Sequence, residues 1–146
     1  MTLKRILLAE DDVSMRRALT HVLESDGYQV VPANTAVEAA AQFWARPPDL
    51  ALLDLNAVAQ DEWWAVDEIC AADPVLPIIL IVRGSVERRE RAMRLGADAL
   101  FEQPFDFPIL LDTIARFMAQ PGGARVARMS RKPSALLMLC KVPGPF

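Results

Sequence analysis

The sequence is poor in the residues that build metal and disulfide sites, with one histidine and two cysteines among 146 residues. Cys70 and Cys140 lie far apart and form no paired motif, so neither a Cys/His zinc site nor a disulfide framework is expected. Long apolar runs are also missing, because no stretch approaches the roughly 18 residues that a membrane span needs. We therefore expect a protein of the reducing cytoplasm with no membrane span.

Acidic residues are absent from the end of the chain. Residues 1–118 hold eleven basic and all nineteen acidic residues, a balance of −8, whereas residues 119–146 hold five basic residues, and the net charge is −3. This split predicts a domain over residues 1–119 and a basic, then apolar tail over residues 120–146. The tail is too short for a DNA-binding output domain, and five charges without a fold predict no direct nucleic-acid binding. Whether it docks or stays disordered is left open.

What the sequence does have is a regular alternation of apolar strands and amphipathic helices. Continuous apolar or β-branched runs predict five strands, at residues 3–9, 28–33, 50–53, 77–82 and 97–102. Apolar residues at helical spacing predict a helix after each strand, beginning near residues 14, 37, 64, 86 and 107. Five such units predict an α/β fold, with a doubly wound five-stranded parallel sheet and helices on both faces.

Three carboxylates follow the ends of two predicted strands. Asp11 and Asp12 come after the first strand, and Asp54 ends the third. Ligands of open parallel sheets bind beyond the carboxyl ends of the strands, so these groups should meet in one site. Neighbouring anions need a cation, and Mg²⁺ takes one or two carboxylates, waters and a phosphoryl oxygen. An aspartate beside Mg²⁺ can also be a nucleophile, whereas Asp12 alone could instead cap the next helix.

With these features, residues 3–118 resemble the receiver domain of two-component response regulators. The segments that carry the resemblance are Asp11-Asp12, Leu52-Leu53-Asp54-Leu55, Pro77-Ile78-Ile79, Gly96-Ala97-Asp98 and Pro104-Phe105. The resemblance implies the flavodoxin-like strand order 2-1-3-4-5. It implies that Asp54 accepts phosphate from a histidine kinase or phosphotransfer protein. It also implies that Asp11, Asp12, Asp54 and the backbone carbonyl of Asn56 hold Mg²⁺. Such a protein is not an enzyme beyond taking phosphate from a donor and slowly losing it.

Three positions depart from the family pattern. The family usually has Thr or Ser at the end of strand four, an aromatic residue in strand five and Lys before the Pro-Phe pair. Here these positions hold Val82, Leu100 and Gln103. Val82 has no hydroxyl for a phosphoryl oxygen, and Gln103 donates hydrogen bonds without carrying a charge. Arg83 or Ser85, which follow strand four, are candidate substitutes.

Two interpretations of this pattern stay open. One is a phosphorylatable receiver with atypical or weakened switching. The other is a degenerate receiver that acts through protein contacts without phosphorylation. A third hypothesis, from another class, is a small Mg²⁺-dependent hydrolase with an aspartate nucleophile. Such phosphatases place a second acid two residues after the nucleophile, and this chain has Asn56 there.

Two further features concern the expected partner surfaces. By resemblance, the fourth helix, fifth strand and fifth helix form the docking surface for an effector or a second copy. The arginines of the fourth helix are interpreted as a solvated face; they are Arg88, Arg89, Arg91 and Arg94. Trp63 and Trp64 follow the predicted metal loop, and the alternatives for them are core packing and a docking role at the rim of the site.

Overall fold

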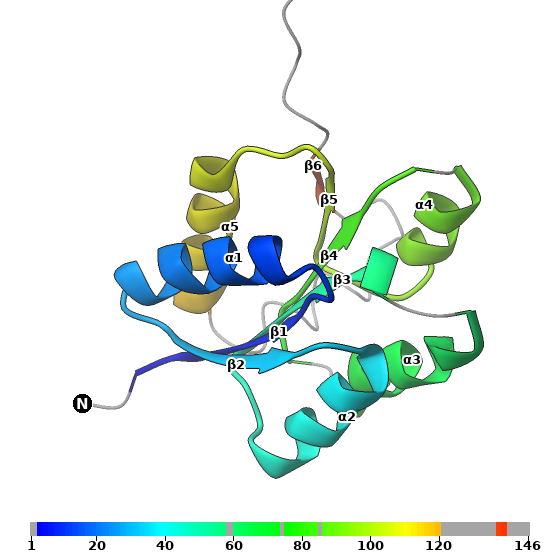
Figure 1. The fold of residues 1–146 in the computed structure, drawn as a ribbon, viewed down its shortest axis with the longest axis horizontal. Helices are drawn as coiled ribbons and strands as arrows, with labels where there is room; N and C mark the ends of the chain where they lie inside the picture. The colour runs from blue at the N-terminus through cyan, green and yellow to red at the C-terminus, as the bar shows by residue number, and fades with distance from the viewer. Residues whose placement is uncertain (1–2, 58–59, 74, 85, 121–136, 140–146) are drawn as a thin grey trace, which may run out of the picture.

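A parallel sheet runs through the centre of the computed structural model, which describes residues 3–57, 60–73, 75–84, 86–120 and 137–139. Its strands are β1 (Arg5–Ala9), β2 (Gln29–Ala33), β3 (Leu50–Asp54), β4 (Ile78–Val82), β5 (Ala99–Glu102) and β6 (Leu137–Leu139). The order is β2-β1-β3-β4-β5-β6, and every neighbouring pair is parallel (Figure 1). The first five strands confirm the predicted flavodoxin-like order.

The sixth strand is an addition that the sequence does not predict. Residues 137–139 of the tail pair in parallel with Ala99, Leu100 and Phe101 of β5, which places them at the edge of the sheet. This short piece of the tail is therefore docked on the domain. The rest of the tail, including Cys140, lies outside the described residues.

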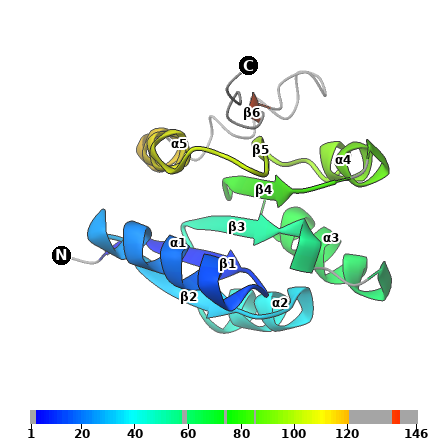
Figure 2. The same cartoon turned by 45° about the horizontal axis from the view of Figure 1, so that its top comes forward.

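Five helices cover the sheet. They are α1 (Val13–Ser25), α2 (Ala36–Ala45), α3 (Trp63–Ala72), α4 (Val86–Met93) and α5 (Phe107–Ala119). Helices α1 and α5 lie on one face, and α2, α3 and α4 lie on the other (Figure 2). Two 3-10 turns, η1 (Leu55–Ala57) and η2 (Gln60–Glu62), lie between β3 and α3. Among the described residues, no helix is both long enough and apolar enough to cross a bilayer.

Local sequence signals explain where these helices begin and end. Thr35 caps α2 by accepting a hydrogen bond from the backbone N–H of Glu38 at 3.0 Å, and the Glu38 carboxylate accepts one from the N–H of Asn34. After α1, Gly27 has a φ of 91°, a left-handed conformation that glycine adopts without steric cost. The predicted helix boundaries thus hold to within a few residues.

The core forms two layers, one on each side of the sheet. All residues of β3 and β4 are buried, as expected for central parallel strands. Because side chains alternate along a strand, Leu100 packs in the layer under α2, α3 and α4, whereas Phe101 packs against α1 and α5. Leu100, at the position of the family's aromatic residue, is therefore a core side chain.

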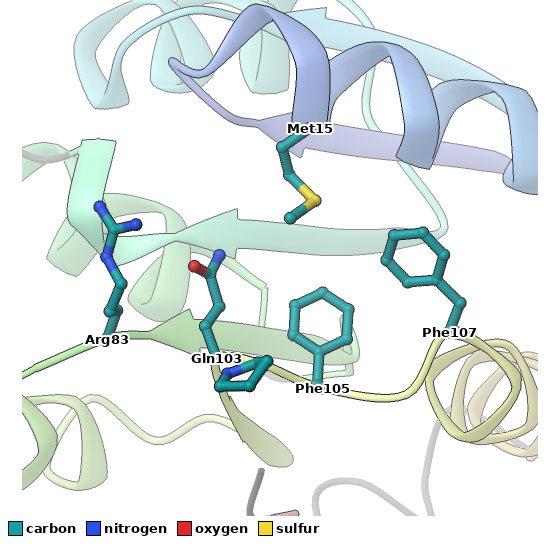
Figure 3. Close-up of a pocket in the computed structure, with 6 residues that line it drawn as sticks. Met15, Arg83, Gln103, Phe105 and Phe107 are labelled. Atoms are coloured by element: carbon teal, nitrogen blue, oxygen red, sulfur yellow. The ribbon is translucent and has the colours of Figure 1, made fainter. Parts of the chain in front are cut away.

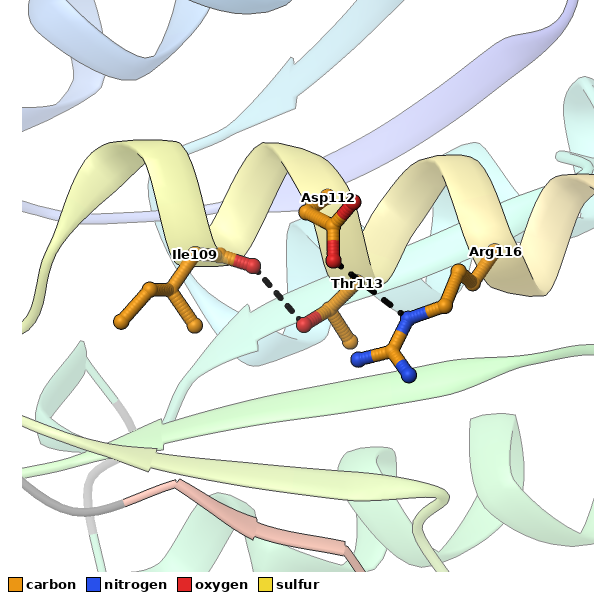
Figure 4. A network of polar contacts seen from close by, with 4 residues as sticks. All are labelled: Ile109, Asp112, Thr113 and Arg116. Carbon is orange, nitrogen blue, oxygen red and sulfur yellow. Dashed lines mark hydrogen bonds and ion pairs between the residues drawn. The ribbon is translucent and has the colours of Figure 1, made fainter.

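Helix α5 shows how the inner and outer faces of a helix differ in their polar contacts. The buried hydroxyl of Thr113 donates to the carbonyl of Ile109 at 2.8 Å, which satisfies it inside the core (Figure 4). Asp112 and Arg116 form an ion pair at 3.5 Å on the exposed face. A pair so exposed to water adds little stability.

Candidate functional site

Asp54 is a buried carboxylate at the carboxyl end of β3, only 3% exposed. Its Oδ1 accepts a hydrogen bond from the backbone N–H of Asn56 at 2.8 Å. Its Oδ2 is contacted by the side-chain nitrogen of Gln103 at 3.4 Å, which is long for a hydrogen bond. Both donors are neutral, so they orient the carboxylate without neutralising its charge.

Glu10 is a second buried carboxyl group, directly after β1 and 1% exposed. Burial raises the pKa of Glu10 to about 9, and the neighbouring Asp54 and Asp11 act in the same direction. Its Oε2 accepts a hydrogen bond from the backbone N–H of Asp12, while its Oε1 is buried without a hydrogen-bond partner among the described residues. Burial beside Asp54 therefore disfavours a second negative charge at this edge of the sheet, and Glu10 keeps its proton in the absence of a cation.

The side chain of Asp12 has a different contact from those of Glu10 and Asp54. Its side chain is exposed and caps α1 by accepting a hydrogen bond from the backbone N–H of Met15 at 3.1 Å. This is the alternative that the sequence leaves open for Asp12. Glu10, which follows β1 directly, is therefore the carboxyl group that lies buried beside Asp54. Two signals indicate Glu10: it directly follows the strand, and Asp12 immediately precedes the first helical residue.

The carboxyl groups of this site suit Mg²⁺, which keeps several water ligands, better than they suit a metal ion whose ligands all come from the protein. In the described part of the chain, no three His, Cys, Asp or Glu side chains gather into a ready-made metal site. Mg²⁺ commonly uses one or two carboxylates and keeps several waters. The unpartnered Oε1 of Glu10 and the carboxylate of Asp54 supply such a partial set of hard oxygen atoms.

Two of the positions that depart from the family pattern lie on the neighbouring strands β4 and β5, and the third, Gln103, directly follows β5. Val82, at the end of β4, is 2% exposed, and Leu100 in β5 is 1% exposed. Gln103 is half-buried and joined to Pro104 by a cis peptide bond. Of the candidate substitutes, Arg83 is exposed, and Ser85 lies outside the described residues.

A cavity of about 360 Å³ opens beside Gln103. Figure 3 shows Met15 of α1 on one side of it, Arg83 and Gln103 at one end and two phenylalanines at the other. The lining residues are Met15, Arg83, Gln103, Pro104, Phe105 and Phe107. The cavity beside Gln103 is therefore mostly apolar, with one exposed cation, Arg83.

The arginines of α4 make specific contacts that the sequence does not indicate. Arg88 donates a hydrogen bond from a guanidinium nitrogen to the side-chain oxygen of Asn56 at 2.8 Å. Arg89 forms an ion pair with Glu102 at 3.6 Å. Arg91 lies 4.2 Å above the ring of Trp63. Arg91 stays exposed, as expected for a solvated face, whereas Arg88 and Arg89 are half-buried through their contacts with η1 and β5.

The two tryptophans divide between the two alternatives. Trp63 is buried, at 6% exposed, and packs in the core beneath Arg91. Trp64 is 54% exposed on the outside of α3. Core packing is thus confirmed for Trp63, and a docking role for Trp64 stays a prediction.

Comparison with known proteins gives a consistent result. Residues 6–115 match the family model described as the response regulator receiver domain. The chain is 31% identical to the chemotaxis protein CheY of Halobacterium salinarum, over 77% of this chain and 94% of that protein. It is 33% identical to the response regulator protein FleR of Pseudomonas aeruginosa, over 92% of this chain but 29% of FleR. A CheY-like receiver domain protein from Methanospirillum hungatei has a similar structure, with a TM-score of 0.73 and 28% identity, over 80% of this chain and 94% of that one.

Proposed function

The chain belongs to the response regulator receiver family, and from this premise we propose that it is a signalling module that accepts a phosphoryl group on Asp54. The observation that carries the proposal is the placement of Asp54. It ends a fully buried central strand, its Oδ1 is fixed by the backbone N–H of Asn56, and it lies beside the carboxyl group of Glu10. The Asn at position 56 argues against the hydrolase alternative, because it cannot serve as the second acid of that mechanism.

Mg²⁺ is the proposed cofactor. Asp11, Asp54 and the backbone carbonyl of Asn56 hold it, and Glu10 takes the place first given to Asp12. When bound, the cation offsets the charge of the carboxylates and of the incoming phosphoryl oxygens. Support comes from the crowding of acids at this edge and from the unpartnered Oε1 of Glu10.

The transfer needs no proton from Asp54. A carboxylate oxygen attacks the phosphorus, a new O–P bond forms, and the bond from phosphorus to the donor breaks. The electron pair of that bond leaves with the donor, as the imidazole nitrogen of a phosphohistidine or as acetate from acetyl phosphate. Because Oδ1 is held at 2.8 Å and Oδ2 is contacted at 3.4 Å, Oδ2 is the less tightly held oxygen and makes the attack.

Switching is weakened relative to other receivers. Val82 offers no hydroxyl to a phosphoryl oxygen, and Leu100 is a buried aliphatic residue with no ring to move. Gln103 supplies a hydrogen-bond donor without the positive charge of lysine. The physiological donor is a histidine kinase or phosphotransfer protein, and an effector or second copy docks on α4, β5 and α5, where β6 already pairs with the edge of β5.

Incubation with acetyl phosphate and Mg²⁺, followed by intact mass measurement, tests the proposal. The wild-type protein should gain one phosphoryl group, and Asp54→Asn should gain none. Asp61→Asn is a matched control, because Asp61 is an exposed acid on η2, and it should behave as wild type. If wild type takes no phosphate at any Mg²⁺ concentration, the degenerate receiver becomes the better description.

A further inference from the structure

We propose that Arg88 is a positioning residue that supplies the positive charge missing at Gln103 and couples α4 to the phosphorylation state of Asp54. The inference rests on the proposed function. Arg88 donates to the side-chain oxygen of Asn56 at 2.8 Å, and the backbone N–H of the same Asn56 donates to Asp54 at 2.8 Å. One residue therefore bridges the helix and the phosphoacceptor.

The orientation of the Asn56 amide follows from this contact. A guanidinium group has only donors, so the Asn56 oxygen must face Arg88. The amide nitrogen then points elsewhere, and it is buried without a hydrogen-bond partner among the described residues. A buried donor without an acceptor is costly. A phosphoryl group on Asp54, two residues before Asn56 in the chain, would bring three acceptor oxygens to the site, and Arg88 leaves the amide nitrogen available to donate to one of them.

Charge singles out Arg88 among the arginines of α4. Arg89 is paired with Glu102, and Arg91 stacks on Trp63, whereas Arg88 contacts the residue whose backbone N–H holds Asp54. Arg88 is half-buried, where its charge is screened less than on the surface. A guanidinium stays protonated at any physiological pH, so Arg88 brings a permanent positive charge to Asn56, whose backbone N–H holds Asp54.

Helix α4 is built to respond to such a contact. Ala92 is the only buried residue between Val86 and Met93, so the helix has little apolar anchoring of its own. Elements with few buried apolar contacts open and shift most easily. When phosphorylation strengthens the link from Asp54 through Asn56 to Arg88, α4 is held more firmly. This coupling needs neither a hydroxyl at Val82 nor a ring at Leu100.

The test measures the rate of phosphorylation by acetyl phosphate and the hydrogen exchange of α4 amides before and after phosphorylation. Arg88→Met should be phosphorylated about tenfold more slowly than wild type, because a charge-assisted hydrogen bond is lost. Arg88→Lys, which keeps the charge, should recover part of the rate. Arg94→Met is the matched control, since Arg94 is exposed directly after α4, and it should stay within about twofold of wild type.

Hydrogen exchange separates positioning from a general structural role. In wild type and Arg94→Met, phosphorylation should slow exchange across α4, whereas in Arg88→Met it should leave α4 unchanged. Asn56→Ala should reproduce the Arg88→Met result, and the double variant should be no slower than either single one. Equal rates and equal protection in Arg88→Met and wild type would overturn the inference alone. If wild type takes no phosphate, the proposed function fails and this inference fails with it.

Discussion

The carboxyl edge of the sheet has two sides with opposite chemistry. The acidic side, formed after β1 and β3, holds Glu10, Asp11 and Asp54. The apolar side, at β4 and β5, holds Val82 and Leu100, which are as buried as the core. The acidic side holds the proposed phosphoacceptor Asp54 and the carboxyl groups proposed to bind Mg²⁺. The apolar side holds aliphatic residues at the positions where the family resemblance implies a hydroxyl group and an aromatic ring.

This difference suggests that binding chemistry and signal readout are separable within one fold. The acids are held by the strands themselves, because strand ends in a parallel sheet meet at one edge. The readout depends on side chains that move, and an aliphatic residue at the same position simply fills space. A contact from elsewhere, such as that of Arg88 with Asn56, can then take over the readout without any change in the sheet.

The largest expected effect tests whether the apolar side serves only packing. Leu100→Ala should lower the free energy of unfolding by about 3 kcal/mol, because it leaves a cavity in a core position. Its phosphorylation rate by acetyl phosphate should stay within about twofold of wild type. Urea denaturation and intact mass measure the two effects, and Ile109→Ala, at a position 46% exposed, is the control with little loss of stability. A large change in phosphorylation without a loss of stability would show that Leu100 has a signalling role.

The second effect tests the acidic side through its pH dependence. The folded state keeps a proton on Glu10 up to a pKa of about 9, whereas the unfolded chain releases it near 4.5. The folded state therefore binds more protons between these values, so without metal its stability falls as pH rises through this window. Glu10→Gln should remove the fall and add about 2 kcal/mol at pH 8, since local rearrangement and water relieve part of the full penalty.

Denaturation curves from pH 5 to pH 9, with and without Mg²⁺, check this expectation. Mg²⁺ should stabilise wild type more than Glu10→Gln, because the cation relieves the same repulsion. Glu24→Gln changes an exposed carboxylate on α1 and should keep the wild-type slope. A wild-type stability that rises across the window would contradict the geometry described for Glu10.

Some features of this edge of the sheet can be predicted from the sequence, and others cannot. Asp54 is predictable because it ends an unbroken apolar strand in the middle of the sheet. The choice between Glu10 and Asp12 is harder, because both belong to one run of acids. Only the end of β1 at Ala9 and the start of α1 at Val13 separate them. Strand β6 is only three residues long, and all three are apolar. The sequence pattern of so short a segment does not distinguish a strand from a helix.

The contact of Arg88 is beyond what the sequence can predict. Its spacing on α4 is that of a charged, exposed helix, and its neighbours Arg89 and Arg91 have the same appearance. Which arginine faces Asn56 depends on how α4 is rotated against the sheet, and this is set by the burial of the single residue Ala92. Tertiary packing decides this point, so periodicity alone cannot supply it.

The smallest expected effect tests whether position 103, on the apolar side, influences the charge of the acidic side. Gln103→Lys places an ammonium group where Gln103 now contacts Asp54 at 3.4 Å. At pH 8 without metal, the variant should gain about 0.5 kcal/mol, because a half-exposed pair is screened and the lysine loses side-chain freedom. In the double variant with Glu10→Gln, the two gains should add to less than their sum, since both relieve repulsion around Asp54. Fully additive gains in urea denaturation would mean that position 103 does not sense the Glu10 and Asp54 pair. The replacement of lysine by glutamine would then have no bearing on the charge balance of the site.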